Sequence, residues 1–138
     1  MKGYSFMDNT LKTLSDYRLE KAQQCYDSAK ILYEAGDYKG AANRNYYCVF
    51  HAIRSVLALE GIDFKKHAAV LAHFRKHYIK TNKLDIQMSD IISEIYQART
   101  DSDYDDFYII SKSETEEQIN RTSIFLKNIR EYLEQNKV

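Results

Sequence analysis

The sequence predicts an all-α protein, an antiparallel, up-and-down bundle of four long helices plus a shorter helix. The 138 residues contain no proline and only four glycines, so nothing forces a break inside a helix. Every periodic apolar segment has the three- and four-residue spacing of a helix, and none alternates as a strand does. At this length we expect residues 1–138 to form one helical domain with its own core.

The first helix is expected to begin near Thr10 or Ser15, after a flexible segment over residues 1–9. Its core stripe consists of residues three or four positions apart: Ala22, Cys25, Ala29 and Leu32. Gly36 suits the position after a helix C-terminus, and Asp37 suits an N-cap. The sequence therefore predicts a tight antiparallel hairpin between the first and second helices.

The second helix, expected over residues 38–60, carries an unusual polar pair opposite its apolar stripe. That stripe consists of Ala42, Tyr46, Val49, Ile53 and Val56. Arg44 and His51 are seven residues apart, so they return to one face after two turns. The residues around the pair are small or amphipathic: Tyr47, Cys48, Ser55 and Ala58. We therefore expect this face to bind or pack against something.

Helical spacing continues through most of the remaining chain. It predicts a third helix over residues 66–79 and a fourth over residues 85–98. Residues 99–112 lack this apolar spacing, so a long loop is expected there. Ser113 and Glu116 fit a capping box, which would start the last helix.

The distribution of charge limits the kinds of partner. The chain has 20 basic and 20 acidic residues, which argues against a general polyanion binder with a wholly basic surface. Any nucleic-acid site must therefore be local. Residues 64–83 contain six Lys or Arg and no acid, whereas residues 101–118 contain seven acids and one Lys. If the basic segment lies beside the second helix, it would contribute to an anion site.

Other features favour a cytoplasmic protein without a membrane segment, metal or cofactor. No apolar run approaches eighteen residues, and the N-terminus lacks the apolar region of a signal peptide. Cys25 and Cys48 have neither metal nor redox spacing and are expected to be small buried side chains. His73 and His77 have the spacing of a metal pair, but no carboxylate lies at a matching position.

Residues 44–51, Arg-Asn-Tyr-Tyr-Cys-Val-Phe-His, resemble the Arg-x(4-6)-His signature of HEPN domains, with the polar Asn45 directly after the Arg. Residues 66–67 and 99–104 resemble further segments of the small single-domain bacterial and archaeal HEPN proteins. The resemblance covers roughly residues 14–134. It implies a toxin-type, metal-independent endoribonuclease that is paired with a nucleotidyltransferase antitoxin.

An Arg and a His on one face suit a phosphodiester. A guanidinium grips two phosphate oxygens, and an imidazole moves protons near neutral pH. In RNA, His51 would deprotonate the 2′-OH while Arg44 stabilises charge on the phosphate, leaving a 2′,3′-cyclic phosphate. Asn45 is expected to orient Arg44 or the phosphate. Contacts to substrate are predicted for four further residues: Tyr47, Lys66, His67 and Tyr104.

The alternative is a non-catalytic module that binds a nucleotide or a partner protein on the same face. In one HEPN branch, a Tyr two residues after the motif His receives AMP from the partner nucleotidyltransferase. Here that position is Ile53, a departure from that branch, and Tyr104 is the candidate substitute.

We also expect a homodimer through the face that carries Arg44 and His51, because a two-fold axis would place two motifs across one cleft. The small residues Ser55 and Ala58 would allow close approach. In the alternative, a monomer, the loop over residues 99–112 covers this face and its acids pair with the arginines of the second helix.

Overall fold

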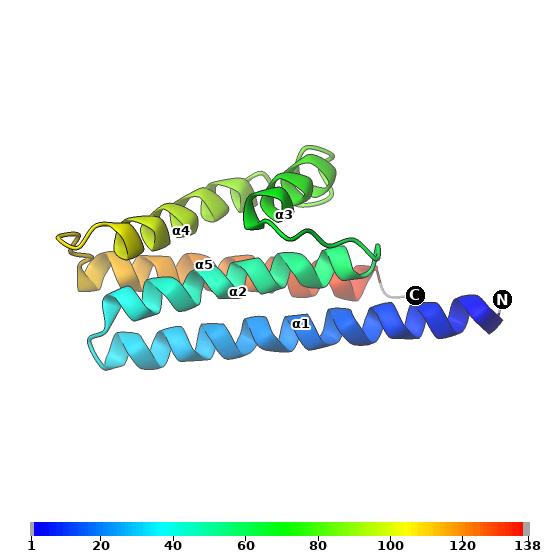
Figure 1. Ribbon diagram of the computed structural model, residues 1–138, viewed down its shortest axis with the longest axis horizontal. Coiled ribbons are helices and arrows are strands. Elements are labelled where there is room, and N and C mark those ends of the chain that lie inside the picture. The colour runs from blue at the N-terminus through cyan, green and yellow to red at the C-terminus, as the bar shows by residue number, and fades with distance from the viewer. Residues whose placement is uncertain (1, 137–138) are drawn as a thin grey trace.

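The computed structural model describes residues 2–136, with side chains from residue 10 onward. Within that range the chain forms five α-helices, one π-helical segment and no strand. Their bounds are α1 Lys2–Glu34, α2 Tyr38–Ala58, α3 His67–Phe74, η1 Arg75–Ile79, α4 Gln87–Tyr104 and α5 Lys112–Gln135. The predicted bundle of four long helices and a shorter one is confirmed (Figure 1). In this part of the chain, no helix has the length and apolar character needed to cross a bilayer.

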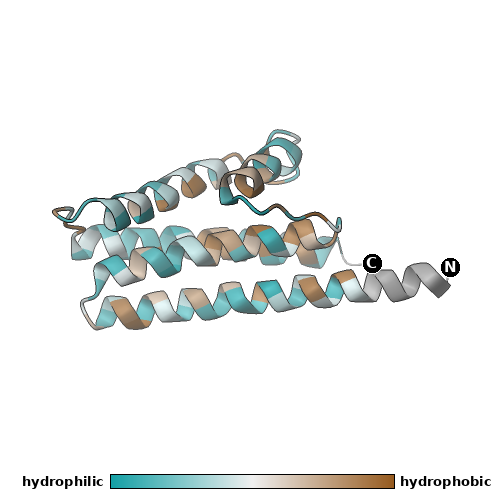
Figure 2. Ribbon diagram, viewed as in Figure 1, coloured by the Kyte–Doolittle hydropathy of each residue, from teal (hydrophilic) through white to brown (hydrophobic). Residues whose placement is uncertain are grey.

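The central element of the bundle is α2, which packs against α1, α5, α4 and α3. Thirteen of its 21 residues are buried, so only a narrow strip of its surface stays open. By contrast, α1 lies on the outside, and hydrophilic and hydrophobic residues are interspersed along its coloured part (Figure 2). The largest fully buried side chains come from α2, α3, α4 and α5: Tyr46, Phe74, Met88 and Phe125 are among them.

The hairpin between α1 and α2 forms as the sequence predicts. Gly36 has a φ of 81°, a left-handed conformation that glycine adopts without a Cβ clash. Asp37 is the N-cap of α2, and its Oδ1 accepts a hydrogen bond of 2.9 Å from the backbone N–H of Gly40. These two residues hold α1 and α2 side by side and antiparallel.

The first helix begins earlier than the predicted Thr10 or Ser15, because α1 starts at Lys2. A helix that has already formed gains one hydrogen bond for each residue added, and no proline stops this extension. The prediction that residues 1–9 are flexible stays a prediction, and Met1 lies outside the described residues.

The predicted long loop over residues 99–112 is wrong for its first half, because α4 continues to Tyr104. Two pairs of side chains spaced four residues apart stabilise the extra turn. Gln97 donates a hydrogen bond of 2.8 Å to Asp101, and Arg99 forms a 2.8 Å ion pair with Asp103. Because polar and charged side chains stabilise this turn, the sequence shows no apolar stripe there. The remaining loop spans only residues 105–111.

The capping box of α5 lies two residues earlier than the predicted Ser113 and Glu116. Ser111 is the N-cap, and its Oγ accepts a hydrogen bond of 3.0 Å from the backbone N–H of Glu114. The side chain of Glu114 approaches the same Oγ at 3.2 Å. Both pairs fit the Ser-x-x-Glu pattern, and the chain uses the first of them.

We expect Ser111→Ala to lower the free energy of unfolding by about 1 kcal/mol, because it leaves a backbone N–H of the first turn without its acceptor. The matched control, Ser113→Ala, removes no cap and should change stability little. Urea unfolding of both variants measures the difference. Equal stability of the two would contradict the assignment of Ser111 as the cap.

The small residues of α2 pack against another helix of the same chain, so they are not available as the contacts of a dimer. Cys48, Ser55 and Ala58 are buried, because α1 packs along this side of α2. Ser15 of α1 donates a 2.6 Å hydrogen bond to the backbone oxygen of Ser55. These residues allow a close approach, as their size predicts, but the helix that approaches belongs to the same chain.

Candidate functional site

A strip of α2 stays partly open between α1 on one side and α3 and α4 on the other. It carries Arg44, Tyr47, His51 and Arg54, which are all only partly buried. We call these four residues the motif face. Arg44 and His51 therefore share a face away from the core, as their spacing of seven indicates.

Tyr47 lies between the two residues of the pair. The guanidinium carbon of Arg44 is 5.3 Å from the centroid of the Tyr47 ring, and the ring of His51 is 6.0 Å from it on the other side. Nε and Nη2 of Arg44 donate hydrogen bonds of 3.1 and 2.7 Å to Oδ1 of Asn43. A guanidinium has five N–H donors, so Arg44 keeps donors for a ligand.

His51 is held in its neutral form. Partial burial, with the positive charges of Arg54, Lys21, Arg44 and Arg18 around it, lowers the pKa of His51 from 6.5 to about 4. Its Nδ1 is buried and has no hydrogen-bond partner among the described residues. Four cations around one imidazole give the motif face a local positive potential, which suits an anionic ligand.

We expect the imidazole of His51 to titrate near pH 4 in the free protein, as measured by NMR. Because the unfolded chain takes up this proton at about pH 6.5, the neutral imidazole stabilises the fold above that pH, and the stabilisation is lost as the pH falls through about 4. Inorganic phosphate should raise this pKa, since it offsets the surrounding cations. Between pH 4 and 6.5, the free energy of unfolding of His51→Gln should depend less steeply on pH than that of the wild type. The control His77→Gln should keep the wild-type dependence. A His51 pKa near 6.5 would contradict this description.

Three of the four cations, Arg18 and Lys21 of α1 and Arg54 of α2, are not among the predicted site residues. Arg18 donates to the backbone oxygen of Arg54 at 3.2 Å, and both arginines pair with Asp63 at 3.1 and 2.5 Å. The monomer alternative predicts that an acid of residues 99–112 pairs with Arg54. The partner of Arg54 is instead Asp63. The spacing of Arg18, Lys21 and Cys25 along the edge of the core stripe was a signal that could have placed these cations beside α2.

Arg99 of α4 closes the site on the opposite side. Its guanidinium carbon lies 4.7 Å from the centroid of Tyr46 and 5.6 Å from that of Tyr47. Sequence reasoning assigned no role to Arg99. The helical extension of α4 beyond the predicted end is what brings this residue to the motif face.

His67, predicted to contact substrate, lies in the wall of the site. Its ring stacks on Phe50 at 4.0 Å, and its Nδ1 shares a 2.9 Å hydrogen bond with the hydroxyl of Tyr46. The ring is also 6.1 Å from that of Tyr47. Burial, followed by the charges of nearby arginines, lowers the pKa of His67 and favours its neutral form. These contacts identify His67 as a rigid neighbour of the motif face.

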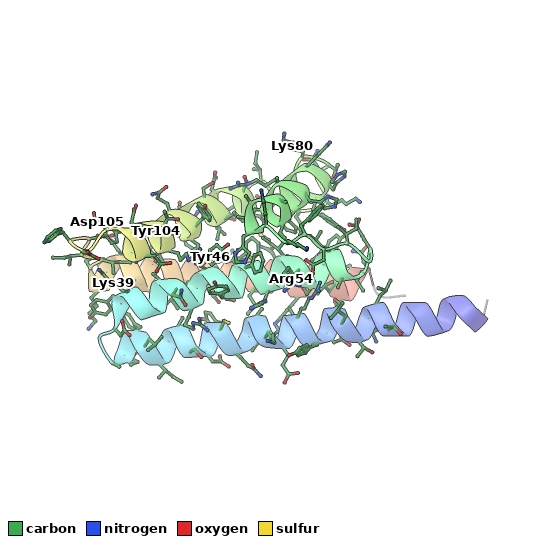
Figure 3. The ribbon with its side chains drawn as sticks, viewed as in Figure 1. Lys39, Tyr46, Arg54, Lys80, Tyr104 and Asp105 are labelled. Atoms are coloured by element: carbon green, nitrogen blue, oxygen red, sulfur yellow. The ribbon has the colours of Figure 1, made fainter. Side chains whose placement is uncertain are left out.

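In the part of the chain that the structure describes, the other two predicted substrate contacts show no hydrogen bond, ion pair or ring contact with the motif face. The side chain of Lys66 is exposed at the start of α3 and makes no capping hydrogen bond. Tyr104 is 80% exposed at the C-terminal end of α4, at the opposite end of the bundle from Lys80 (Figure 3). Among the described residues, no ring lies in contact with Tyr104.

The structure does not bring the side chain of Asn45 to the motif face. One helical step of about 100° turns its side chain away from Arg44 and into the protein interior. Asn45 is 0% exposed, and neither its Oδ1 nor its Nδ2 has a hydrogen-bond partner among the described residues. It therefore cannot touch a phosphate bound at the motif face.

The histidines of α3 and η1 form a separate cluster. The rings of His73 and His77 lie 4.3 Å apart, and Nε2 of His73 is 3.5 Å from a carboxylate oxygen of Glu60. Over the part of the chain that the structure describes, no three His, Cys, Asp or Glu side chains are grouped as a metal site would require.

Comparison with known proteins matches this chain to one family. The profile of the HEPN domain matches residues 15–132. A protein of Methanocaldococcus jannaschii named "Putative toxin MJ0142" is 36% identical over 83% of this chain and 78% of its own length. A Thermotoga maritima "UPF0332 protein" is 27% identical over 94% of this chain and 98% of its own. An Archaeoglobus fulgidus protein of the same name is 25% identical over 88% and 97%.

Proposed function

The chain belongs to the HEPN family, and from this premise we propose that it is a toxin-type, metal-independent endoribonuclease. The observation that carries the proposal is the neutral imidazole of His51, which lies among four cations and shares a face with Arg44. A neutral imidazole can accept a proton, and the cations attract a phosphodiester.

In the proposed reaction, the scissile phosphate of RNA lies over Tyr47, between Arg44 and His51. The free donors of Arg44 bind phosphate oxygens, and His51 takes the proton of the adjacent 2′-OH. The 2′-oxygen attacks phosphorus, and the bond to the 5′-oxygen breaks as that oxygen takes up a proton. The products are a 2′,3′-cyclic phosphate and a 5′-OH. The bound phosphate also raises the low pKa of His51, which makes it a better base.

We further propose that the active form is a homodimer through the motif face. A second imidazole could supply the proton that the leaving oxygen needs, and a two-fold axis through this face provides one. Exposed apolar side chains favour this surface. Leu14 and Tyr17 lie on α1 within one turn of Arg18, and Phe64 follows the Asp63 that pairs with Arg18. They replace Ser55 and Ala58 as the predicted contacts.

A nucleotidyltransferase antitoxin remains part of the proposal. Ile53, the position that is a modified Tyr in one HEPN branch, is fully buried, so control at that position does not apply to this chain. Tyr104 is the accessible candidate for modification because its side chain is largely exposed.

One observation favours a second function, a non-catalytic module that binds a nucleotide. An imidazole with a pKa of about 4 is a weak base, and it remains a hydrogen-bonding group without taking up a proton. This function predicts that nucleotides bind at the motif face while RNA stays intact.

The test is expression of the wild type beside His51→Ala, together with incubation of each purified protein with single-stranded RNA in EDTA. The proposal predicts that the wild type inhibits growth and cuts RNA, and that His51→Ala does neither. If the wild type binds RNA but leaves it intact, the binding module is correct and the endoribonuclease proposal is wrong. Cleavage that stops in EDTA would also overturn the metal-independent mechanism.

A further inference from the structure

A groove distinct from the motif face runs between α3 and η1 on one side and α4 on the other. Its volume is about 820 Å³. Three basic residues, Arg75, Lys76 and Lys80, line it together with the aromatic ring of Tyr96. We call it the α3–α4 groove. Its cations belong to the basic segment at residues 64–83, which contributes no cation to the environment of His51.

The charge of this groove suits an anion. None of its lining residues is acidic. Arg75 is fixed in place, because it donates hydrogen bonds of 3.1 Å to Oγ of Ser89 and 2.6 Å to Oγ of Ser93. Lys76 and Lys80 are exposed, and neither makes an ion pair in the described part of the chain. The groove therefore holds one rigid positive charge and two that are free to meet phosphates.

Tyr96 gives the groove a surface on which a base can stack. Tyr96 is 41% exposed, and its ring is tilted against that of the buried Tyr46, with 5.9 Å between the centroids. A partly exposed aromatic ring beside free lysines is the combination found where single-stranded nucleic acids bind, since the ring holds a base and the lysines hold phosphates. An acidic protein would use the lysines but would have no need of the ring.

The groove leads to the motif face. The ring of Tyr46 contacts both Tyr96, which lines the groove, and Tyr47 of the motif face, which lies 5.2 Å away between centroids. At the start of α3, His67 lies beside the motif face, and the next residue, Ala68, lines the groove. The α-helical rise over residues 68–74 gives about 9 Å, and η1 extends the groove further to Lys80, so it has room for a few nucleotides.

We propose that the α3–α4 groove binds a segment of single-stranded RNA that flanks the phosphate at the motif face. This inference rests on the proposed function, since it assigns the path that the substrate takes beyond the cleavage site. Lys76 and Lys80 bind backbone phosphates, and Tyr96 stacks on one base.

The test measures binding of a short fluorescein-labelled single-stranded RNA by anisotropy. All proteins carry His51→Ala, so that the RNA stays intact. Lys76→Gln/Lys80→Gln should weaken binding about tenfold, and it should reduce the slope of log affinity against log salt by about 1.4, since each phosphate contact on a single strand contributes about 0.7. The control Lys39→Gln/Lys127→Gln removes two exposed lysines elsewhere and should keep the affinity and the slope.

The stacking role has its own pair of variants. Tyr96→Ala should weaken binding about tenfold, whereas Tyr96→Phe, which keeps the ring, should bind as the parent does. Equal RNA affinity of the groove and control lysine variants would overturn the proposal. So would competition by polyglutamate as strong as that by unlabelled RNA of equal charge, because it would indicate an acidic protein as the ligand. The experiment measures only RNA binding, so its result is valid whether or not the wild type cuts RNA.

Discussion

His51→Ala is expected to lower the rate of RNA cleavage in EDTA by on the order of 10³-fold. The substitution removes the base that takes the 2′-OH proton, and no other imidazole of the chain stands in its place. His67 is bound to Tyr46 and stacked on Phe50. The control His77→Ala removes an exposed imidazole and should leave the rate unchanged. Comparable rates for the two variants would contradict the role of His51.

We expect His51→Ala to lose RNA cleavage while it stays folded. The Nδ1 of His51 is buried and has no hydrogen-bond partner in the described part of the chain, so removing the ring relieves an unpaired polar atom while it loses some packing. We expect the melting temperature to change by only a few degrees.

Arg44→Lys should also lose most activity, because a single ammonium cannot replace the bidentate hydrogen bonding of a guanidinium. Circular dichroism of each variant separates loss of chemistry from loss of fold.

Ala58→Glu is expected to destabilise the fold by about 4 kcal/mol or more, or to prevent folding. Ala58 is 1% exposed, so a glutamate there would be a buried, unpaired charge in a space that holds only a methyl group. The control Ile31→Glu places the same side chain on an exposed position of α1 and should cost little. Urea unfolding compares the two. A stable, folded Ala58→Glu would contradict the packing of α1 on α2.

Tyr17→Glu is the appropriate variant to test the proposed dimer. Tyr17 is 51% exposed on α1, so the substitution should leave the monomer folded while it adds charge to the proposed contact. Light scattering at micromolar concentration should give a dimer mass for the wild type and the monomer mass of 16.2 kDa for Tyr17→Glu. A wild-type mass near that of the monomer would exclude a stable dimer.

The sequence predicted the fold through apolar spacing and turn residues. Gly36 and Asp37 mark a left-handed turn and an N-cap because few other residues suit those positions, and both perform these roles in the structure. The end of α4 was missed because its last turn is held by charged pairs such as Arg99 with Asp103, which leave no apolar stripe. Side-chain hydrogen bonds and ion pairs stabilise this turn of the helix without any apolar periodicity.

For the site, the sequence placed Arg44 and His51 on one face but not the residues around them. The spacing of a single helix fixes angles within that helix only. It puts Arg18 and Lys21 at the edge of the α1 core stripe, beside α2, but it cannot show that they lie near His51, and it does not place Arg99 of α4 at all. The same limit applies at Ser55, since small size predicts close packing without naming the partner helix. Asn45 was assigned from its place beside Arg44 in the chain, although one helical step carries it into the interior.

The most direct test of the central claim is the chemistry of the new RNA ends. Cellular RNA is digested in EDTA by the wild type and by His51→Ala, and the ends are identified by mass spectrometry. We predict 2′,3′-cyclic phosphate and 5′-OH ends with the wild type and their absence with His51→Ala. Ends carrying a 3′-OH and a 5′-phosphate, or the same cyclic ends with both proteins, would contradict an active site built from Arg44 and His51.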